Sequence, residues 1–304
     1  MELLKPDSIN FADYEWQTDC KAKVRPAADF AEQLAAELEP AQRDTAPTVF
    51  SFKLGRVLRF RAGEVTAWAG YSGHRKSMVT GQVAVELAHQ RQRTLVISLE
   101  MSPAKTLARM ARQFTGQAIP RDLARFHNGT RDLFVFDHSG RITPAQCIAV
   151  CNYFAQECGG QQVFIDSFMM VCGSEESMDD QKQMTTDLVR MAQDTSMHVH
   201  LVAHCRKPST GDEAKAPGKH DLRGTAAITD QCSNVVTVWA NKPKQDATRE
   251  AEAKGVMCSK WDEPDAELTV CKQRNGEFEG RLKLWLDRQS LRFVDNRESE
   301  VTTW

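Results

Sequence analysis

The 304-residue sequence lacks several features that would assign it to a familiar class of protein. Its nine cysteines are odd in number and include no Cys-x-x-Cys pair, which argues against a disulfide framework and against a zinc ribbon. No apolar run reaches the roughly 18–20 residues that a membrane-spanning helix needs, and the N-terminus has no charged-then-apolar signal pattern. We therefore expect free thiols in a cytoplasmic protein with no membrane partner.

The sequence also lacks an excess of charge of either sign. It has 39 Lys and Arg residues against 41 Asp and Glu residues, a formal net charge of −2 at pH 7. This balance excludes a globally basic nucleic-acid coat and a strongly acidic disordered chain, although a few local loops could still bind nucleic acid. The length allows one large domain or two small ones, with a core that needs no disulfide or metal.

Residues 1–48 differ in composition from the rest of the chain. They carry ten acidic residues against five basic ones and little sustained apolar pattern. Within them, 26–40 is predicted to be a helix that begins at Pro26 and has apolar residues every four positions. Such a stripe needs a partner surface, on its own domain or on a neighbouring subunit. We expect an N-terminal segment over 1–48 and one domain over 49–304.

Apolar runs and helical patterns alternate from about residue 57 onward. The sequence predicts strands over 64–70, 94–101, 132–140, 161–172 and 198–205, separated by helices over 76–90, 102–116, 143–160 and 184–197. This alternation indicates an α/β fold, a mostly parallel sheet with helices on both faces. Shorter runs in the last third predict strands that extend the sheet, partly antiparallel, over 234–240, 255–260, 267–274, 281–287 and 291–295.

The segment after the first of these strands, GYSGHRKS, offers the strongest chemical clue. Gly70, Lys76 and Ser77 are in register with G-x-x-x-x-G-K-[ST], a loop whose backbone N–H groups, lysine and hydroxyl hold phosphates and Mg²⁺. Arg75 replaces the second glycine of the pattern, which predicts either a strained loop or a different backbone path. The candidate nucleotide-binding residues are Gly70, Ser72, Gly73, His74, Arg75, Lys76 and Ser77.

Three further polar residues end predicted strands, where open α/β sheets bind their ligands. Asp166 in VFIDS is placed as a Mg²⁺-coordinating carboxylate, or is an ordinary strand-end aspartate. Glu100 in ISLEM could orient or deprotonate an attacking water, or cap the next helix. His204 in VAHCRK could sense a terminal phosphate and pass that state to the following loop, or be structural.

That following loop, 205–224, is basic and contains glycine and proline, so it could contact a nucleic-acid backbone or be an ordinary solvated loop. Its candidate DNA-binding residues are Arg206, Lys207, Lys215, Lys219 and Arg223. The acidic loop over 173–182 receives no such assignment. Late in the chain, the arginine of KQRNG (272–276) could act as a finger that neutralises charge in a neighbour's site, or form a surface charge pair.

Six segments, in this order, resemble the ATPase domain of DnaB-type hexameric replicative helicases: GYSGHRKS, VISLEMS, VFIDS, VAHCRK, DLRGTAAITDQCSNVVTVW and KQRNG. The likeness covers about residues 50–295 and is greatest to the phage and Twinkle-like variety, in which a histidine takes the sensor position. It implies a RecA-like P-loop ATPase fold of superfamily 4, with ATP and Mg²⁺ as cofactors. It also implies a homohexameric ring around single-stranded DNA in a bacterial or phage-infected cell, with a primase or helicase loader as a further partner.

The resemblance gives each candidate residue a role. The ATP site would comprise Lys76 and Ser77 on the phosphates and Mg²⁺, Asp166 on Mg²⁺, Glu100 as catalytic base and His204 as γ-phosphate sensor. Lys272 and Arg274 would reach into the ATP site of the next subunit, with Arg274 as the finger. The loop 205–224 would line the DNA channel, and the helix over 26–40 would be a linker that docks on the adjacent subunit.

The sequence thus predicts an ATP hydrolase that works as a hexameric DNA helicase or translocase on single-stranded DNA in DNA replication. Two alternatives stay open. A RecA-like recombinase would share the fold but needs an N-terminal polymerisation element, of which the sequence shows no sign. A non-hydrolysing or weakly hydrolysing module that binds DNA or regulates a helicase would follow if Arg75 filled the phosphate site. The retained polar residues argue against such decay: Glu100, Asp166, His204 and Arg274.

Overall fold

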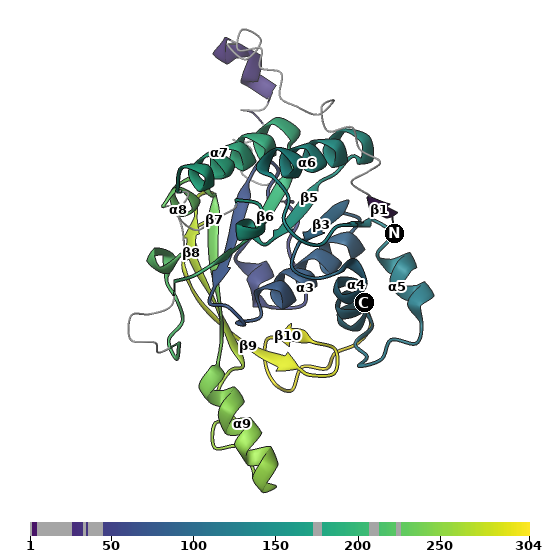
Figure 1. Cartoon of the computed structure of the whole chain (residues 1–304), viewed down its shortest axis with the longest axis vertical. Coiled ribbons are helices and arrows are strands. Elements are labelled where there is room, and N and C mark those ends of the chain that lie inside the picture. The colour runs from purple at the N-terminus through teal and green to yellow at the C-terminus, as the bar shows by residue number, and fades with distance from the viewer. Residues whose placement is uncertain are drawn as a thin grey trace.

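A single ten-stranded sheet forms the centre of the molecule (Figure 1). The computed structural model describes residues 2–4, 26–32, 35, 45–172, 178–206, 213–222 and 226–304. The strand order is β1-β4-β3-β5-β6-β2-β7-β8-β9-β10. Strands from β1 to β7 pair in parallel, and β8, β9 and β10 extend the sheet by antiparallel pairing. The predicted α/β class with an antiparallel C-terminal extension is confirmed.

The bounds of the elements follow the predicted order. The strands are β1 (Glu2–Leu4), β2 (Val65–Gly70), β3 (Thr94–Ser98), β4 (Leu133–Phe136), β5 (Gln162–Asp166), β6 (His198–His204), β7 (Asn234–Ala240), β8 (Ala266–Gln273), β9 (Gly280–Asp287) and β10 (Arg292–Val294). The α-helices are α3 (Lys76–His89), α4 (Pro103–Thr115), α5 (Leu123–Gly129), α6 (Pro144–Cys158), α7 (Met178–Thr195), α8 (Ala227–Gln231) and α9 (Lys242–Lys254). No helix among the described residues has both the length and the hydropathy that crossing a bilayer requires.

Helices cover both faces of the sheet, so the central strands are buried on both sides. On one face, α6 and α7 pack over β2, β5 and β6 in a cluster that includes Ala67, Ile165 and Leu201. On the other face, α3 and α4 pack against β2 and the C-terminal strands in a cluster that includes Trp68 and Phe293. Every residue of β2 is buried, which anchors the start of the loop that follows it.

Local sequence rules account for the helix ends that the sequence predicts well. Ser102 and Pro103 begin α4, and a left-handed Gly116 ends it. Thr143 begins α6 with a capping box, in which its hydroxyl accepts from the Gln146 N–H and the Gln146 side chain accepts from the Thr143 N–H. These bonds satisfy backbone groups that each helix would otherwise leave unpaired.

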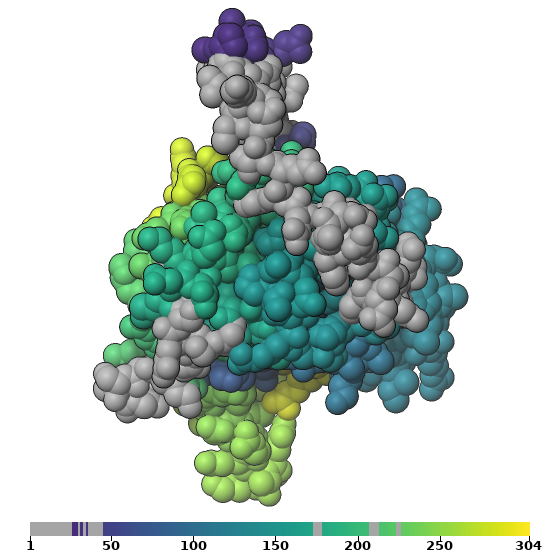
Figure 2. All heavy atoms as spheres, turned by 45° about the horizontal axis from the view of Figure 1, so that its top comes forward, coloured from purple at the N-terminus to yellow at the C-terminus, as the bar shows by residue number. Residues whose placement is uncertain are grey.

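Some predicted boundaries are wrong. The strand predicted over 255–260 does not form: Gly255, at φ +66°, ends helix α9, and the residues after it lie in turns. The strand predicted over 161–172 ends at Asp166 and gives way to a 3₁₀ turn (Phe168–Met170). Helix α7 begins at Met178, six residues before its predicted start. Helix α9, which was not predicted, projects from the body of the molecule (Figures 1 and 2).

The N-terminal segment contributes one strand that was not predicted. Strand β1 pairs in parallel with β4 at the edge of the sheet. In the helix predicted over 26–40, a 3₁₀ turn (Ala27–Phe30) follows Pro26, and only 26–32 and 35 are among the described residues. The remaining residues of that prediction lie outside them.

Candidate functional site

The loop from Gly70 to Ser77 connects β2 to α3 at the carboxyl edge of the sheet. Gly70 lies so close to β7 that an added Cβ would be 2.3 Å from the Val238 carbonyl oxygen, so no other residue fits there without a backbone shift. Gly73 has φ +75°, and Ser72 and Gly73 are exposed at the crest of the loop. The loop therefore presents its backbone to solvent at the start of a 14-residue helix, where N–H groups and the helix dipole attract anions.

Arg75 adopts a left-handed backbone with φ 65° and ψ 23°. The strained loop predicted from the missing glycine is confirmed, and α3 still begins at Lys76. Burial lowers the pKa of Arg75, Asp265 raises it and Arg288 lowers it. Asp265 precedes β8 and Arg288 follows β9, so the charged neighbours of Arg75 lie at the ends of the C-terminal strands.

Lys76 is buried and donates to three acceptors. Its Nζ donates to the carbonyl oxygens of Gly70 at 3.0 Å and Tyr71 at 2.9 Å, and lies 3.2 Å from Nδ1 of His204. Because an ammonium can only donate, Nδ1 of His204 accepts and its Nε2 carries the hydrogen. Burial lowers the pKa of Lys76, and the Asp166 carboxylate raises it.

His204 connects Lys76 to Glu100. Its Nε2 lies 3.6 Å from Oε1 of Glu100, and the Ser167 hydroxyl donates to the same oxygen at 2.5 Å. The hydrogen bond from His204, followed by that from Ser167, lowers the pKa of Glu100 to about 2. Glu100 is therefore ionised at neutral pH.

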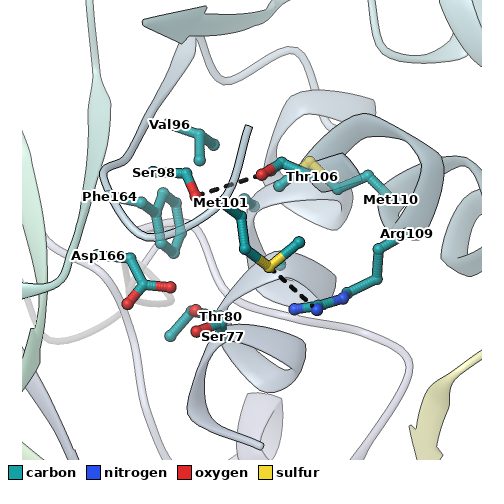
Figure 3. Close-up of a pocket in the computed structure, with 12 residues that line it drawn as sticks. Ser77, Thr80, Val96, Ser98, Met101, Thr106, Arg109, Met110, Phe164 and Asp166 are labelled. Carbon is teal, nitrogen blue, oxygen red and sulfur yellow. Dashed lines mark hydrogen bonds between the residues drawn. The ribbon is translucent and has the colours of Figure 1, made fainter. Parts of the chain in front are cut away.

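Asp166 ends β5 beside β3, opposite Ser98 in the register. Desolvation raises the pKa of Asp166, and a hydrogen bond from the Ser77 side chain lowers it. A cavity lies between these residues and helix α4, with Ser77, Asp166 and Arg109 in its walls (Figure 3). The predicted neighbours Ser77 and Asp166 are thus brought together.

His74 turns its side chain away from the crest of the loop. Its Nδ1 accepts from the Ala240 N–H at 3.1 Å, so the hydrogen lies on Nε2 and is donated to Glu213 at 3.0 Å. Burial lowers the pKa of this fully buried imidazole. The His74 side chain fastens the loop to β7, and only its backbone is available to a ligand.

Lys272 and Arg274 lie at the amino-terminal ends of the parallel strands, at the opposite end of the strands from the nucleotide loop. Strand β8 runs antiparallel to β7, so Gln273 faces Asn234, the first residue of β7. The Lys272 ammonium donates to the carbonyl oxygens of Thr229 at 2.8 Å and Asp230 at 2.9 Å, and Arg274 donates to the Asp230 carbonyl at 3.2 Å. The two cations therefore do not reach the loop of their own chain.

The basic loop after β6 is only partly described. Cys205 and Leu222 form an antiparallel bridge at its base, where the Arg206 N–H donates to the Asp221 carbonyl. Desolvation lowers the pKa of Lys272, and the charge of Lys219 lowers it further. Arg206, Lys215 and Lys219 are exposed, and Lys207 and Arg223 lie outside the described residues.

The donor set fits a magnesium nucleotide. A hydroxyl and a carboxylate are oxygen ligands of the kind that Mg²⁺ takes, with phosphates and water completing its shell. Among the described ranges there is no group of three His, Cys, Asp or Glu residues that could hold a metal alone. Ser77 and Asp166 would hold the ion, and Lys76 and the loop backbone would hold the phosphates.

Comparison with known proteins agrees with this arrangement. A sequence model of the AAA domain matches residues 56–210, just over half of the chain. The chain belongs to this AAA domain family. The match contains the loop, Glu100, Asp166 and His204, and ends before Lys272 and Arg274.

Two solved structures share the fold of this AAA domain protein. The ATPase domain of G40P matches with a TM-score of 0.69 and 16% identity over 90% of this chain and 100% of that one. A DnaB-like replicative helicase, described with its interactions with primase, matches with the same score, identity and coverage of this chain, over 69% of its own. The resemblance to DnaB-type ATPase domains is confirmed at the level of the fold.

Sequence reasoning missed two polar residues of the site. Ser167 follows Asp166 directly, and its hydroxyl donates a hydrogen bond to Glu100. The motif VFIDS includes this serine, but its sequence gives no sign of the contact. Arg109 reaches the cavity from the second turn of α4. Its spacing of nine residues after Glu100 gives no direct signal, because the direction of the side chain depends on how α4 packs.

Proposed function

We propose that this chain is a Mg²⁺-dependent ATP hydrolase that drives a DnaB-type helicase on single-stranded DNA. The observation that carries the proposal is the contact series from Lys76 through His204 to Glu100, beside Ser77 and Asp166, at one edge of the sheet. A cation for phosphates, an ionised carboxylate for water and an oxygen pair for Mg²⁺ are the parts that phosphoryl transfer to water needs.

In this proposal Lys76 exchanges the carbonyl oxygens of its own loop for the terminal phosphates of ATP. Bound Mg²⁺ supplies neutralisation of the phosphate charge. Glu100 accepts a hydrogen bond from the attacking water, and its low pKa favours orienting the water over fully removing its proton. His204 lies between both groups, so loss of the terminal phosphate would change its contacts and those of the loop it begins.

An assembly of copies would bring Lys272 and Arg274 to the nucleotide loop of a neighbouring chain. Arg274 and Lys272 lie at the sheet edge opposite the loop, where they could serve only a neighbouring copy. A closed ring presents every such edge to the next loop, and the resemblance to DnaB-type helicases suggests six subunits. The exposed Arg206, Lys215 and Lys219 would then contact DNA phosphates, and a primase or loader is the partner expected in replication.

The alternative of a non-hydrolysing module depends on Arg75 filling the phosphate site. The charged groups that influence Arg75 are Asp265 and Arg288, whereas those that influence Lys76 include Asp166 and Glu100. This arrangement favours hydrolysis over a blocked site.

Unwinding of a forked DNA duplex with ATP and Mg²⁺ tests the helicase proposal. The wild-type chain should separate the strands, and Glu100→Gln should not, because a neutral amide lacks the negative charge that orients and polarises the attacking water. Hydrolysis of ATP without any strand separation would restrict the function to a translocase or another DNA-dependent ATPase.

A further inference from the structure

A buried carboxylate fixes the turn that carries Arg274. Strand β8 ends at Gln273, so Arg274 and Asn275 lie in the turn that leads to β9. The Asn275 amide donates to Oε1 of Glu64 at 2.6 Å. Glu64 is 5% exposed and comes directly before β2, and β7 lies between β2 and β8 in the sheet. The contact therefore spans the sheet from the start of β2 to the end of β8.

The Glu64 carboxylate is held in place by other groups as well. Its second oxygen, Oε2, accepts from the Asn234 amide of β7 at 3.0 Å, and the same amide donates to the Thr66 hydroxyl at 3.1 Å. The Arg61 guanidinium lies 3.9 Å from Oε1. Two amides and a cation thus compensate the charge, as a buried carboxylate requires. Glu64 is a fixed acceptor for Asn275 and not a mobile surface charge.

The backbone of the turn follows the same route to β2. The Arg274 N–H donates to the Ser233 carbonyl, and the Ser233 N–H donates to the Val65 carbonyl, both at 2.9 Å. The Arg274 guanidinium donates to the Asp230 carbonyl at 3.2 Å, but the side chain is exposed. The guanidinium can exchange this carbonyl for another acceptor, whereas its backbone stays where the turn holds it.

The position of the turn matters because a guanidinium that serves a second chain must meet its phosphate within hydrogen-bond distance. Asn275 is the next residue after Arg274, and its amide connects the turn to the buried carboxylate of Glu64. Without this hydrogen bond, the turn loses a side-chain contact with the sheet beside the arginine. A displacement of about 1 Å at a reacting group can reduce a rate about a hundredfold.

We propose that Asn275 and Glu64 are positioning residues, and that the hydrogen bond between them places Arg274 for the nucleotide site of a neighbouring copy. The inference rests on the proposed function, because it requires Arg274 to act in a second chain. Asn275 and Glu64 do not touch the nucleotide themselves. They connect Arg274 to β2, the strand that leads into the nucleotide loop of its own chain.

ATP hydrolysis by full-chain variants tests the role through a reversed hydrogen bond. Asn275→Asp keeps the side-chain size but sets two carboxylates against each other, so it should lower kcat about tenfold with little change in KM. In Glu64→Gln combined with Asn275→Asp, the glutamine amide can donate to the introduced carboxylate and its oxygen can accept from Asn234. This double variant should return kcat to within about threefold of the wild type. Asn128→Asp makes the same change at an exposed position of α5 and should hydrolyse ATP like the wild type.

Mixtures of variants show whether the pair acts through Arg274. Asn275→Asp mixed with Lys76→Ala should recover part of the hydrolysis, because the intact loop of one chain then meets the intact arginine of the other. Asn275→Asp mixed with Arg274→Ala should not recover it, because both changes affect the arginine side of the site. A merely structural role of Asn275 would give the two mixtures equal rates.

The outcomes separate the positioning role from the proposed function. Wild-type rates in Asn275→Asp, or equal rates in the two mixtures, would overturn the positioning role and leave the proposed function standing. An inactive wild type would overturn both. Full activity of Arg274→Ala would overturn the inference, because the pair would then position a group with no part in the reaction. A folded double variant no faster than Asn275→Asp would overturn the contact with Glu64. If the double variant does not fold, the two mixtures decide, since neither changes Glu64.

Discussion

At the scale of single residues, His204 connects the Lys76 ammonium to the Glu100 carboxylate. Its Nδ1 accepts from Lys76 and its Nε2–H faces Glu100, so one ring meets a donor and an acceptor at once. A glutamine amide also offers one acceptor and one donor, whereas an alanine offers neither. We expect His204→Gln to keep ATP hydrolysis within about tenfold of the wild type and His204→Ala to lose about a hundredfold, a barrier difference of about 1.4 kcal/mol between them.

Steady-state hydrolysis with saturating Mg-ATP measures this difference. Equal rates for the glutamine and alanine variants would show that the bridge from Lys76 to Glu100 has no part in the reaction. Nucleotide binding should be retained in both variants, which separates a damaged reaction from a damaged site.

Arg75 stores strain at the start of α3. A non-glycine residue in the left-handed region costs about 1–2 kcal/mol, and Arg75 has φ 65°. Arg75→Gly should therefore raise the free energy of unfolding by about 1 kcal/mol in a urea titration, after the greater flexibility of glycine in the unfolded chain is subtracted.

Arg91 is a matched control for this substitution. It also has positive φ, lies just after α3 and is away from the nucleotide loop. Arg91→Gly should also raise the free energy of unfolding, by a smaller amount because the exposed ion pair with Asp132 is lost. It should not alter nucleotide binding. A destabilised Arg75→Gly would mean that contacts of the arginine outweigh the backbone strain.

At the scale of elements, strand β6 carries two fully buried histidines. Burial lowers the pKa of His198 from 6.5 to about 4 and that of His200 further, so both are neutral in the folded chain. His200 accepts from the Trp68 indole at 3.2 Å and donates to Gln162 at 3.1 Å, which fixes its neutral tautomer. Folding therefore opposes protonation at this strand.

The pH dependence follows from the direction of these shifts. At these two histidines the unfolded chain binds protons below pH 6.5 and the folded chain does not, so the stability they contribute is present above pH 6.5 and is lost as pH falls toward 4. The shift of His198 alone corresponds to about 3 kcal/mol. Urea titrations at several pH values should show this loss, and His220→Gln, at an exposed position, should leave it unchanged. Burial raises the pKa of Glu86 to about 7, which opposes this loss, so the test is made on Glu86→Gln, where a flat profile between pH 7 and pH 5 would contradict the argument.

The sequence predicts elements well where local rules and burial agree. The strands from 64–70 to 198–205 are apolar because both faces of the sheet are covered, and Ser102, Gly116 and Thr143 mark helix ends through their own hydrogen bonds or dihedral angles. Helix α9 escaped prediction because it projects from the body and has no apolar stripe, burying only Lys244 and Ala251. The sequence marks the ends of this helix only by the Asn241 cap and by Gly255. The short apolar run after Gly255 suggested a strand there instead.

The sequence predicts those residues of the candidate site that lie at the ends of strands. Glu100, Asp166 and His204 come together because the carboxyl ends of parallel strands meet at one edge. Ser167, Arg109 and the inward turn of His74 depend on side-chain directions that no spacing records. The motif therefore predicts the reaction class, and the packing adds the side chains that lie beside the predicted ones.

At the scale of the whole molecule, the two ends of the parallel strands carry the two parts of one proposed site: the nucleotide loop with Glu100 at one end, and Arg274 at the other. A mixture of Glu100→Gln and Arg274→Ala chains tests this directly, because each should be inactive alone. Where the loop of an Arg274→Ala chain meets the arginine of a Glu100→Gln chain, Glu100 and Arg274 are both intact. Mixing should therefore restore part of the hydrolysis. A mixture of Lys76→Ala and Glu100→Gln should restore less, because both changes lie on the loop side. Absence of any rescue would place Arg274 outside the reaction.

The measurement that tests the central claim most directly is Mg²⁺-dependent ATP hydrolysis with and without single-stranded DNA, for the wild type and Arg75→Gly side by side. The account predicts that both hydrolyse ATP and that DNA stimulates both, because Lys76, Ser77 and Asp166 keep their places despite the left-handed arginine. Activity in Arg75→Gly alone would mean that the natural loop is switched off. Inactivity of both would contradict the account and favour a DNA-binding module that does not hydrolyse ATP.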